Sequence, residues 1–194
     1  MKWGATWRIP DVSVHMPMGS GAITGLAWGL SPRMMRKDET MTDAIRLYVP
    51  TDEAAVVAVW HRAGRTVYTF LPTWQAFTRA HARQVFTDII VPSCDVWVGT
   101  DDERVMAFLA LKQSYIDRLY VDPAAQRQGW GSRLLDHAKA LQPVGLELHT
   151  HQENHGARAL YVRHGFIAVR FGLSPAPESA PDVEYHWRPQ ETLG

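Results

Sequence analysis

Residues Ile116–Lys139 read IDRLYVDPAAQRQGWGSRLLDHAK, and this stretch decides the fold of the chain. Its β-branched and aromatic residues predict a strand that ends at Val121. Pro123 then stops the strand, because proline has no N–H to give to a ladder. Leu134 and Ala138 recur at helical spacing further on. The stretch therefore predicts a strand, a tight turn and a helix.

Two glycines, Gly129 and Gly131, lie where this helix begins. Glycine lacks a Cβ and lets a ligand approach the backbone, while the first N–H groups of a helix are unpaired and carry partial positive charge. Such a turn is suited to an anion, above all a phosphate. Neither common phosphate motif fits, because Ser132 and Arg133 replace the Lys-Ser/Thr of a P-loop and the third glycine of the dinucleotide fingerprint is missing.

The turn Gln126–Gly131, after a strand ending at Val121, resembles the acetyl-CoA-binding motif of the GNAT superfamily. That motif is Arg or Gln, two residues, Gly, one residue, then Gly or Ala. A second, independent segment also resembles the family, in the expected order, through Asn154, Ala157, Leu160-Tyr161 and His164-Gly165-Phe166. The resemblance covers roughly Ala44 to Trp187.

The resemblance implies the GNAT fold, an α/β (α+β) arrangement with a mixed, mostly antiparallel sheet of about six to seven strands flanked by about four helices. Periodicity and breakers predict the segments. The expected strands are Ile45–Val49, Val96–Thr100, Val105–Leu111, Tyr115–Val121, Leu146–Thr150, Phe166–Phe171 and Val183–Trp187. The expected helices are a first one ending near Gly64, a second over about Thr73–Ile89, Gly129–Leu141 and His155–His164.

The catalytic domain is expected over residues 41–190, and residues 1–40 form an N-terminal extension. Prolines and glycines are scattered through this extension, so we expect it to be disordered or weakly packed, and Met41 is a candidate natural start. The alternative is that Trp3, Trp7 and Trp28 dock on the domain or on a second subunit.

Composition narrows the class of protein. The 194 residues include 20 basic and 20 acidic side chains, so no global field attracts nucleic acid or an anionic membrane. No apolar run approaches the roughly 20 residues of a membrane span. The single Cys94 cannot form an internal disulfide and fits a reducing cytoplasm, and no motif around it indicates a nucleophile. We expect a cytoplasmic protein, and the resemblance makes a homodimer possible.

The resemblance further implies acetyl-CoA as co-substrate. Backbone N–H groups of the glycine turn would hold its pyrophosphate, and the strand before the turn would bind the pantetheine arm, with an N–H near Val121 polarising the thioester carbonyl. The expected cofactor-binding residues are Leu119, Tyr120, Val121, Gln126, Arg127, Gln128, Gly129, Trp130, Gly131, Ser132, Asn154 and Tyr161.

Tyr161 aligns with the tyrosine that protonates the leaving thiolate in the family. Asn154 can also simply cap its helix. The general base stays open between His149, Asp117 and another group, including an ordered water. The acceptor also stays open, as a primary amine of a small molecule, a peptide or a protein.

Two other functions compete with catalysis of acetyl transfer. A non-catalytic acyl-CoA-binding or regulatory module would keep the glycine turn, but Tyr161 argues for an enzyme. A metal-dependent enzyme could use His149, His151 and His155. We expect no metal, because no Cys or carboxylate signature accompanies these histidines and the third follows a loop. Acidic Asp182 and Glu184 bind a substrate ammonium or, more simply, lie on the surface.

Overall fold

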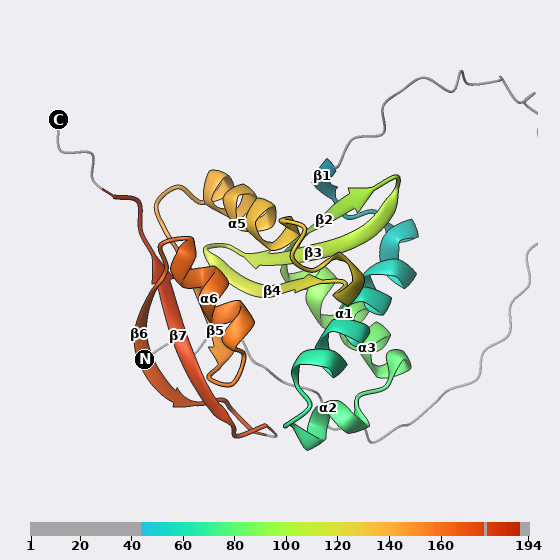
Figure 1. The fold of residues 1–194 in the computed structure, drawn as a ribbon. Helices are drawn as coiled ribbons and strands as arrows, with labels where there is room; N and C mark the ends of the chain where they lie inside the picture. Colours follow the sequence, from blue (N-terminus) through green and yellow to red (C-terminus); the bar gives the residue numbers. More distant parts are fainter. Residues whose placement is uncertain (1–43, 177, 191–194) are drawn as a thin grey trace, which may run out of the picture.

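The computed structural model describes residues 44–176 and 178–190, and within them it contains one seven-stranded sheet of order β1-β2-β3-β4-β5-β7-β6 (Figure 1). The N-terminal extension expected over residues 1–40 lies outside the described residues. The strands are β1 (Ala44–Leu47), β2 (Asp95–Asp101), β3 (Arg104–Lys112), β4 (Tyr115–Val121), β5 (Leu146–His151), β6 (Ile167–Leu173) and β7 (Pro181–Trp187). All neighbours pair antiparallel except β4 and β5, which confirms the expected mixed, mostly antiparallel sheet.

Helices cover both faces of the sheet, with α1 and α3 on one face and α5 and α6 on the other (Figure 1). The helices are α1 (Glu53–Val67), α2 (Pro72–Ala76), α3 (Arg79–Val85), a π-helical turn Phe86–Ile90, α4 (Val91–Ser93), α5 (Trp130–Leu141) and α6 (His155–Arg163). Because α2 and α4 are short, the four longer helices match the expected number.

Strand β3 shows how the two layers are built, since its alternate side chains belong to different cores. Phe108 and Ala110 pack with Trp60 of α1. Ala107 and Leu109 pack in the second core, which α5 and α6 complete. Apolar residues on both sides of β3 therefore place it at the centre of the domain.

The prediction of one helix over Thr73–Ile89 is wrong. The chain is extended at Phe77, and Thr78 begins a new helix by accepting a hydrogen bond from the N–H of His81 at 3.1 Å. The break lets Trp74 and Phe77 meet edge-to-face at 4.9 Å between ring centroids, with both rings buried. Aromatic packing and a local cap therefore override helical propensity here.

The parallel strands β4 and β5 separate soon after they meet. Their ladder has one register pair, Tyr115 with Glu147. Beyond it, β4 stays paired with β3 as far as Val121, and β5 stays paired with β7 as far as His151. The facing edges of β4 and β5 thus carry backbone groups without a partner strand between them, which opens a gap at the carboxyl ends of the two strands.

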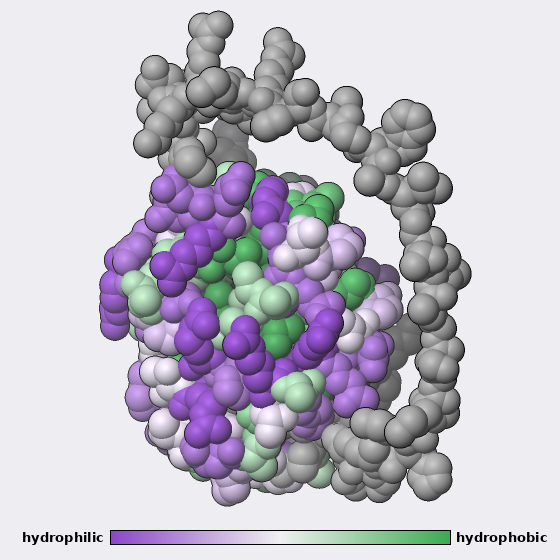
Figure 2. Space-filling model, turned by 90° about the vertical axis from the view of Figure 1, so that its right-hand side faces the viewer, coloured by the Kyte–Doolittle hydropathy of each residue, from purple (hydrophilic) through white to green (hydrophobic). Residues whose placement is uncertain are grey.

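The outer surface of the domain is largely hydrophilic on the side that carries α1, where a small hydrophobic area lies among polar residues (Figure 2). Among the described residues, none of the helices has the length and apolar character that crossing a bilayer demands.

Candidate active site

A cavity of about 480 Å³ lies where β4 and β5 separate. Its wall brings together residues from α1, β4, the glycine turn, β5 and α6. The predicted residues in it are Asp117, Leu119, Tyr120, Val121, Gln126, Arg127, Gly129, Trp130, Gly131, Ser132, His149, Asn154 and Tyr161. Gln128 is the predicted residue outside this wall, and its side-chain amide donates instead to the Ala124 carbonyl at 3.1 Å.

Glycine is required at the two positions of the turn for different physical reasons. Gly129 has φ +88°, in the left-handed region that favours glycine, and a Cβ added there would meet nothing within 4 Å. Gly131 has no positive φ, but its Cβ would lie 2.9 Å from Leu160 Cδ2 of α6. Gly129 thus shapes the turn, while Gly131 allows α5 to pack closely against α6.

The turn fits a pyrophosphate. Within the described part of the chain, none of the N–H groups from Gln128 to Ser132 donates to a backbone carbonyl. The first such bond of the helix runs from the Arg133 N–H to the Gly129 carbonyl at 3.0 Å. Unpaired donors at the start of α5, beside an open glycine, are what an anionic group requires.

Two side chains hold the turn in place from behind. The Trp130 ring is buried against Gly99 of β2, where a Cβ would lie 2.7 Å from it, and the Arg133 guanidinium lies 3.6 Å from its centroid. Asp122 accepts from the Ala124 N–H at 3.0 Å and forms an ion pair with Arg62 of α1. Burial alone would raise the pKa of Asp122, but the bonds from Arg62 and Ala124 outweigh it and lower this pKa.

Tyr161 lies on α6 with its ring buried between Phe166 and Tyr185, at centroid distances of 5.7 and 5.8 Å. Burial raises the pKa of its phenol, and the nearby Tyr68 acts in the same direction. The hydroxyl therefore keeps its proton throughout the physiological range and is available as a donor in the cavity wall.

Asn154 caps α6, as the sequence predicts. Its side-chain oxygen accepts from the Ala157 N–H at 3.2 Å, and its amide donates to the Thr150 hydroxyl at 3.4 Å and to the Tyr68 hydroxyl at 3.5 Å. One side chain thus ties the start of α6 to β5 and to the loop after α1.

Asp117 is the extra residue of a β-bulge, because Ala110 faces Arg118 while Leu111 faces Ile116. Its carboxylate forms an ion pair with Arg118 at 3.0 Å. Arg118 is buried, and although burial alone would lower its pKa, Asp117 and the surrounding tyrosines raise it. A fixed pair of opposite charges therefore forms part of the wall between β4 and α1.

His149 lies on β5, directly opposite Glu184 of β7. Its Nδ1 lies 3.1 Å from the Tyr115 hydroxyl, and its Nε2 lies 3.6 Å from a Glu184 carboxylate oxygen. Burial lowers the pKa of His149, and the opposing effect of Glu184 is smaller. The imidazole is therefore neutral near neutral pH and can accept a proton.

The three histidines considered for a metal do not converge. His151 Nε2 lies 3.1 Å from Glu178, and the side chain of His155 is 77% exposed beside Glu153. In the described part of the chain, no group of three His, Cys, Asp or Glu side chains could hold a metal ion. The carboxylate of Glu184 also has hydrogen-bond partners, since it accepts from Arg170 and from His186 at 2.8 Å each.

The sequence did not single out Arg118, which lines the cavity, or Tyr115, which contacts His149 from outside the cavity wall. The signal for Arg118 was available in the spacing. Arg118 lies two residues from Ile116 and two residues from Tyr120 on a central strand, a spacing that predicts a buried position. Tyr115 gave no such signal, since only the pairing of β4 with β5 brings it beside His149.

Comparison with known proteins agrees with this geometry. Residues 92–168 match a family model described as the acetyltransferase (GNAT) domain. A Salmonella typhimurium protein named peptidyl-lysine N-acetyltransferase YjaB is 31% identical over 112 residues, which cover 57% of this chain and 74% of that protein. Its Escherichia coli namesake is 26% identical over 115 residues, covering 57% and 73%.

Solved structures share the fold. The solution structure of apo-form YjaB from Escherichia coli superposes with a TM-score of 0.64 at 21% identity, covering 76% of this chain and 98% of that one. A GCN5-related N-acetyltransferase from Rhodopseudomonas palustris superposes with a TM-score of 0.63 at 18% identity, covering 78% and 99%.

Proposed function

The chain belongs to the GNAT acetyltransferase family, and from this membership we propose that it transfers the acetyl group of acetyl-CoA to a primary amine by direct attack. One observation carries the proposal. The separation of β4 from β5 joins the glycine turn, Tyr161 and the polar pair Asp117 and His149 in a single cavity. No covalent enzyme intermediate is needed, because the site requires only an anion-binding turn, a proton donor and a proton acceptor.

We further propose that the acceptor is the side-chain amine of a lysine in a peptide or protein. The support comes from the two relatives, both named peptidyl-lysine N-acetyltransferases. The carboxylate of Asp117 in the cavity wall offers an acceptor for an incoming ammonium, and its ion pair with Arg118 at 3.0 Å weakens its attraction for that second cation.

At the cofactor end, the N–H groups from Gln128 to Ser132 would hold the pyrophosphate, and the free edge of β4 from Leu119 to Val121 would bind the pantetheine arm. Acetyl-CoA supplies an activated acyl group as a thioester. The N–H near Val121 would stabilise negative charge on the carbonyl oxygen, an effect on the order of 3 kcal/mol for one well-placed donor.

At the acceptor end, an incoming lysine ammonium must give up one proton before its nitrogen can attack, and the nitrogen loses a second proton after it has bonded to the acetyl carbon. With the Nε2 proton of His149 directed at Glu184, Nδ1 is the basic atom, and it meets the hydroxyl of Tyr115. We assign the first proton to His149, which lines the cavity and whose ring the Tyr115 hydroxyl holds at Nδ1, and the second proton passes to solvent. Glu184 then stabilises the imidazolium.

The carbon–sulfur bond breaks as the new carbon–nitrogen bond forms, and the leaving sulfur takes up the hydroxyl proton of Tyr161. The resulting phenolate regains a proton from solvent before the next turnover. Burial of Tyr161 keeps the hydroxyl protonated until the thiolate develops beside it.

The decisive experiment offers a lysine peptide with a blocked N-terminus to the full chain and acetyl-CoA, and follows free thiol release together with peptide mass. One added acetyl group on the lysine is expected. The same peptide with norleucine in place of lysine is the matched control. Tight binding of CoA without transfer to any amine would contradict the proposal and favour the non-catalytic acyl-CoA-binding module.

Two expectations from the sequence belong to this proposal. A cytoplasmic location is supported by the single Cys94, and a homodimer is supported only by the family resemblance. Size-exclusion chromatography with light scattering on the full chain tests the second of these.

A further inference from the structure

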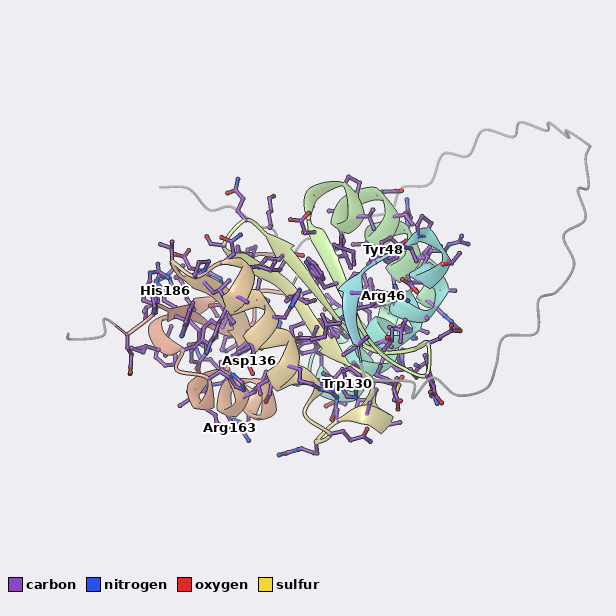
Figure 3. The ribbon with its side chains drawn as sticks, turned by 90° about the horizontal axis from the view of Figure 1, so that it is seen from above. Arg46, Tyr48, Trp130, Asp136, Arg163 and His186 are labelled. Carbon is purple, nitrogen blue, oxygen red and sulfur yellow. The ribbon has the colours of Figure 1, made fainter. Side chains whose placement is uncertain are left out.

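Contacts among three polar side chains lead from the glycine turn to the exposed surface of α5. These side chains belong to Ser132, His164 and Asp136. The Ser132 hydroxyl lies 2.9 Å from His164 Nε2, and His164 Nδ1 lies 3.3 Å from a carboxylate oxygen of Asp136. Asp136 lies on α5 in the seam with α6 (Figure 3). Neither His164 nor Asp136 is part of the cavity wall, whereas Ser132 is.

The position of Ser132 connects this chain of contacts to ligand binding. It is the third residue of α5, in the first turn, where its backbone N–H has no carbonyl partner among the described residues. A pyrophosphate at this turn would also meet the Ser132 hydroxyl. A hydroxyl helps an anion only when its O–H donates to the anion, because its oxygen lone pairs repel negative charge.

The protonation of His164 decides where that O–H points. In a neutral imidazole, Asp136 favours the proton on Nδ1, so Nε2 is a bare acceptor and takes the Ser132 proton for itself. In the imidazolium, Nε2–H donates to the Ser132 oxygen, and the hydroxyl proton is released toward the cavity. One proton on His164 therefore converts Ser132 from an acceptor facing the anion into a donor.

We propose that His164 and Asp136 are positioning residues for the pyrophosphate of acetyl-CoA, and that the protein takes up a proton on His164 when this group binds. The proposal rests on the proposed function, which supplies the phosphate ligand. It adds a step to binding: Asp136 holds the imidazolium, the imidazolium orients Ser132, and Ser132 donates to the anion.

The charges around His164 set the strength of the effect. Asp136 favours the imidazolium but its side chain is 66% exposed, so water and salt weaken its hold. Lys139 of α5 opposes the imidazolium, since its ammonium donates to the His164 carbonyl at 2.6 Å. Arg163 precedes His164 on α6 and also opposes it. The pyrophosphate would add negative charge on the Ser132 side of the ring, and the proposal links proton uptake to this added charge.

The test measures proton uptake by calorimetry at neutral pH, in two buffers of different ionisation enthalpy, on the full chain. Dephospho-CoA is the probe, because it keeps the pyrophosphate and lacks the 3′-phosphate, which itself titrates near neutral pH. Acetyl-CoA is titrated in parallel. The variants are Ser132→Ala, His164→Gln and Asp136→Asn, with His155→Gln as the matched control on the exposed side of α6.

We expect proton uptake in the wild type and in His155→Gln, and its loss in Ser132→Ala and His164→Gln. In His164→Gln the new side-chain amide donates to Ser132 at every pH, so affinity stays within about twofold of the wild type at low pH, while Ser132→Ala weakens binding about tenfold through one lost hydrogen bond. Asp136→Asn lowers the uptake at a given pH.

Unchanged proton uptake in His164→Gln would overturn the inference, because binding would then be independent of this imidazole. Release of acetate from acetyl-CoA that depends on Ser132 would also overturn it, since the hydroxyl would then be a nucleophile. A wild-type protein that binds neither CoA probe at any pH would instead disprove the proposed function, so the two failures are distinguishable.

Discussion

The cofactor end and the acceptor end of the cavity are formed by different kinds of chemical group. At the proposed cofactor end the candidate ligand-binding groups are backbone N–H groups of one short segment, Gly129–Ser132, and one hydroxyl. At the acceptor end they are side chains from separate strands, among them Asp117 on β4 and His149 on β5. A single turn makes the first end, whereas the second exists only after β4, β5 and β7 have assembled.

This difference predicts that substitutions at the cofactor end alter ligand affinity, whereas substitutions at the acceptor end alter turnover. In the proposed mechanism the backbone donors hold the pyrophosphate equally before and after reaction, so substitutions there are expected to change affinity. In the same mechanism, side chains at the acceptor end exchange protons as bonds form and break, so substitutions there are expected to change turnover. The following predictions test that division, beginning with the largest effect.

Replacing Tyr161 by Phe is expected to lower turnover by about 100-fold or more, the lower range for loss of a general acid. The ring would still pack against Phe166 and Tyr185, so acetyl-CoA affinity should not change. Steady-state kinetics and calorimetric titration of the same preparation measure the two quantities.

Tyr185→Phe is the matched control, because Tyr185 is buried beside Tyr161 and its hydroxyl accepts only an Arg158 hydrogen bond at 3.3 Å among the described residues. Its turnover should stay near that of the wild type. If Tyr161→Phe turns over at the wild-type rate, another group protonates the thiolate and the assignment is wrong.

His149→Gln is expected to reduce turnover by about 100-fold, which is typical for loss of a general base. The pH profile gives a sharper test. Burial lowers the pKa of His149, so the imidazole loses its proton at lower pH than an ordinary histidine, and kcat/KM should rise with pH below the usual histidine range. The Glu184 carboxylate raises this pKa, so Glu184→Gln should move the rise to still lower pH.

Asp117→Asn distinguishes the two candidates for the base. If Asp117 only attracts the ammonium, its loss should raise the KM for the amine and leave the pH profile in place. If the rise of kcat/KM with pH disappears in Asp117→Asn and persists in His149→Gln, the general base is Asp117 and the assignment to His149 is wrong. His155→Gln, on the exposed part of α6, should alter neither quantity.

The same division explains what could be read from the sequence. The strand, turn and helix over Ile116–Lys139 were predictable because their signals are local: a proline, two glycines and a helical period. The break at Phe77 and the partnership of Tyr115 with His149 were not, because packing between distant segments causes both. Asp117 and His149 stood out as residues, but no spacing rule measures the gap between β4 and β5.

Gly129 and Gly131 provide a milder, paired test within the cofactor end. Gly129→Ala places a side chain at φ +88°, a strain of about 1 kcal/mol or more, which we expect to distort the turn and weaken acetyl-CoA binding about tenfold. Gly131→Ala presses on Leu160, so it should lower the free energy of unfolding by about 1 kcal/mol with little effect on affinity.

Gly156→Ala is the control for both, since a Cβ there meets nothing within 4 Å and its φ is not in the left-handed region. Because Gly156 lines the cavity, this variant is a control for stability alone, which should be equal or slightly higher. Equal loss of affinity in Gly129→Ala and Gly131→Ala would show that the two glycines share one role, against the geometry of the turn.

The smallest expected effect concerns the contact that joins the two ends. Asp122, at the start of the turn, is ion-paired with Arg62 of α1, the helix that contributes Ala63 and Val67 to the cavity wall. Asp122→Asn keeps an oxygen for the Ala124 N–H but loses the charge, and because Arg62 is half exposed the cost should be only about 1 kcal/mol. The folded pKa of Asp122 is lowered, so its contribution is complete above the unfolded pKa of a carboxyl and disappears as the pH falls through the folded value. Urea unfolding of both proteins at several pH values should therefore give free energies of unfolding that converge in acid. A difference that does not depend on pH would mean that Asp122 acts by packing, and that the two ends of the cavity are electrostatically independent.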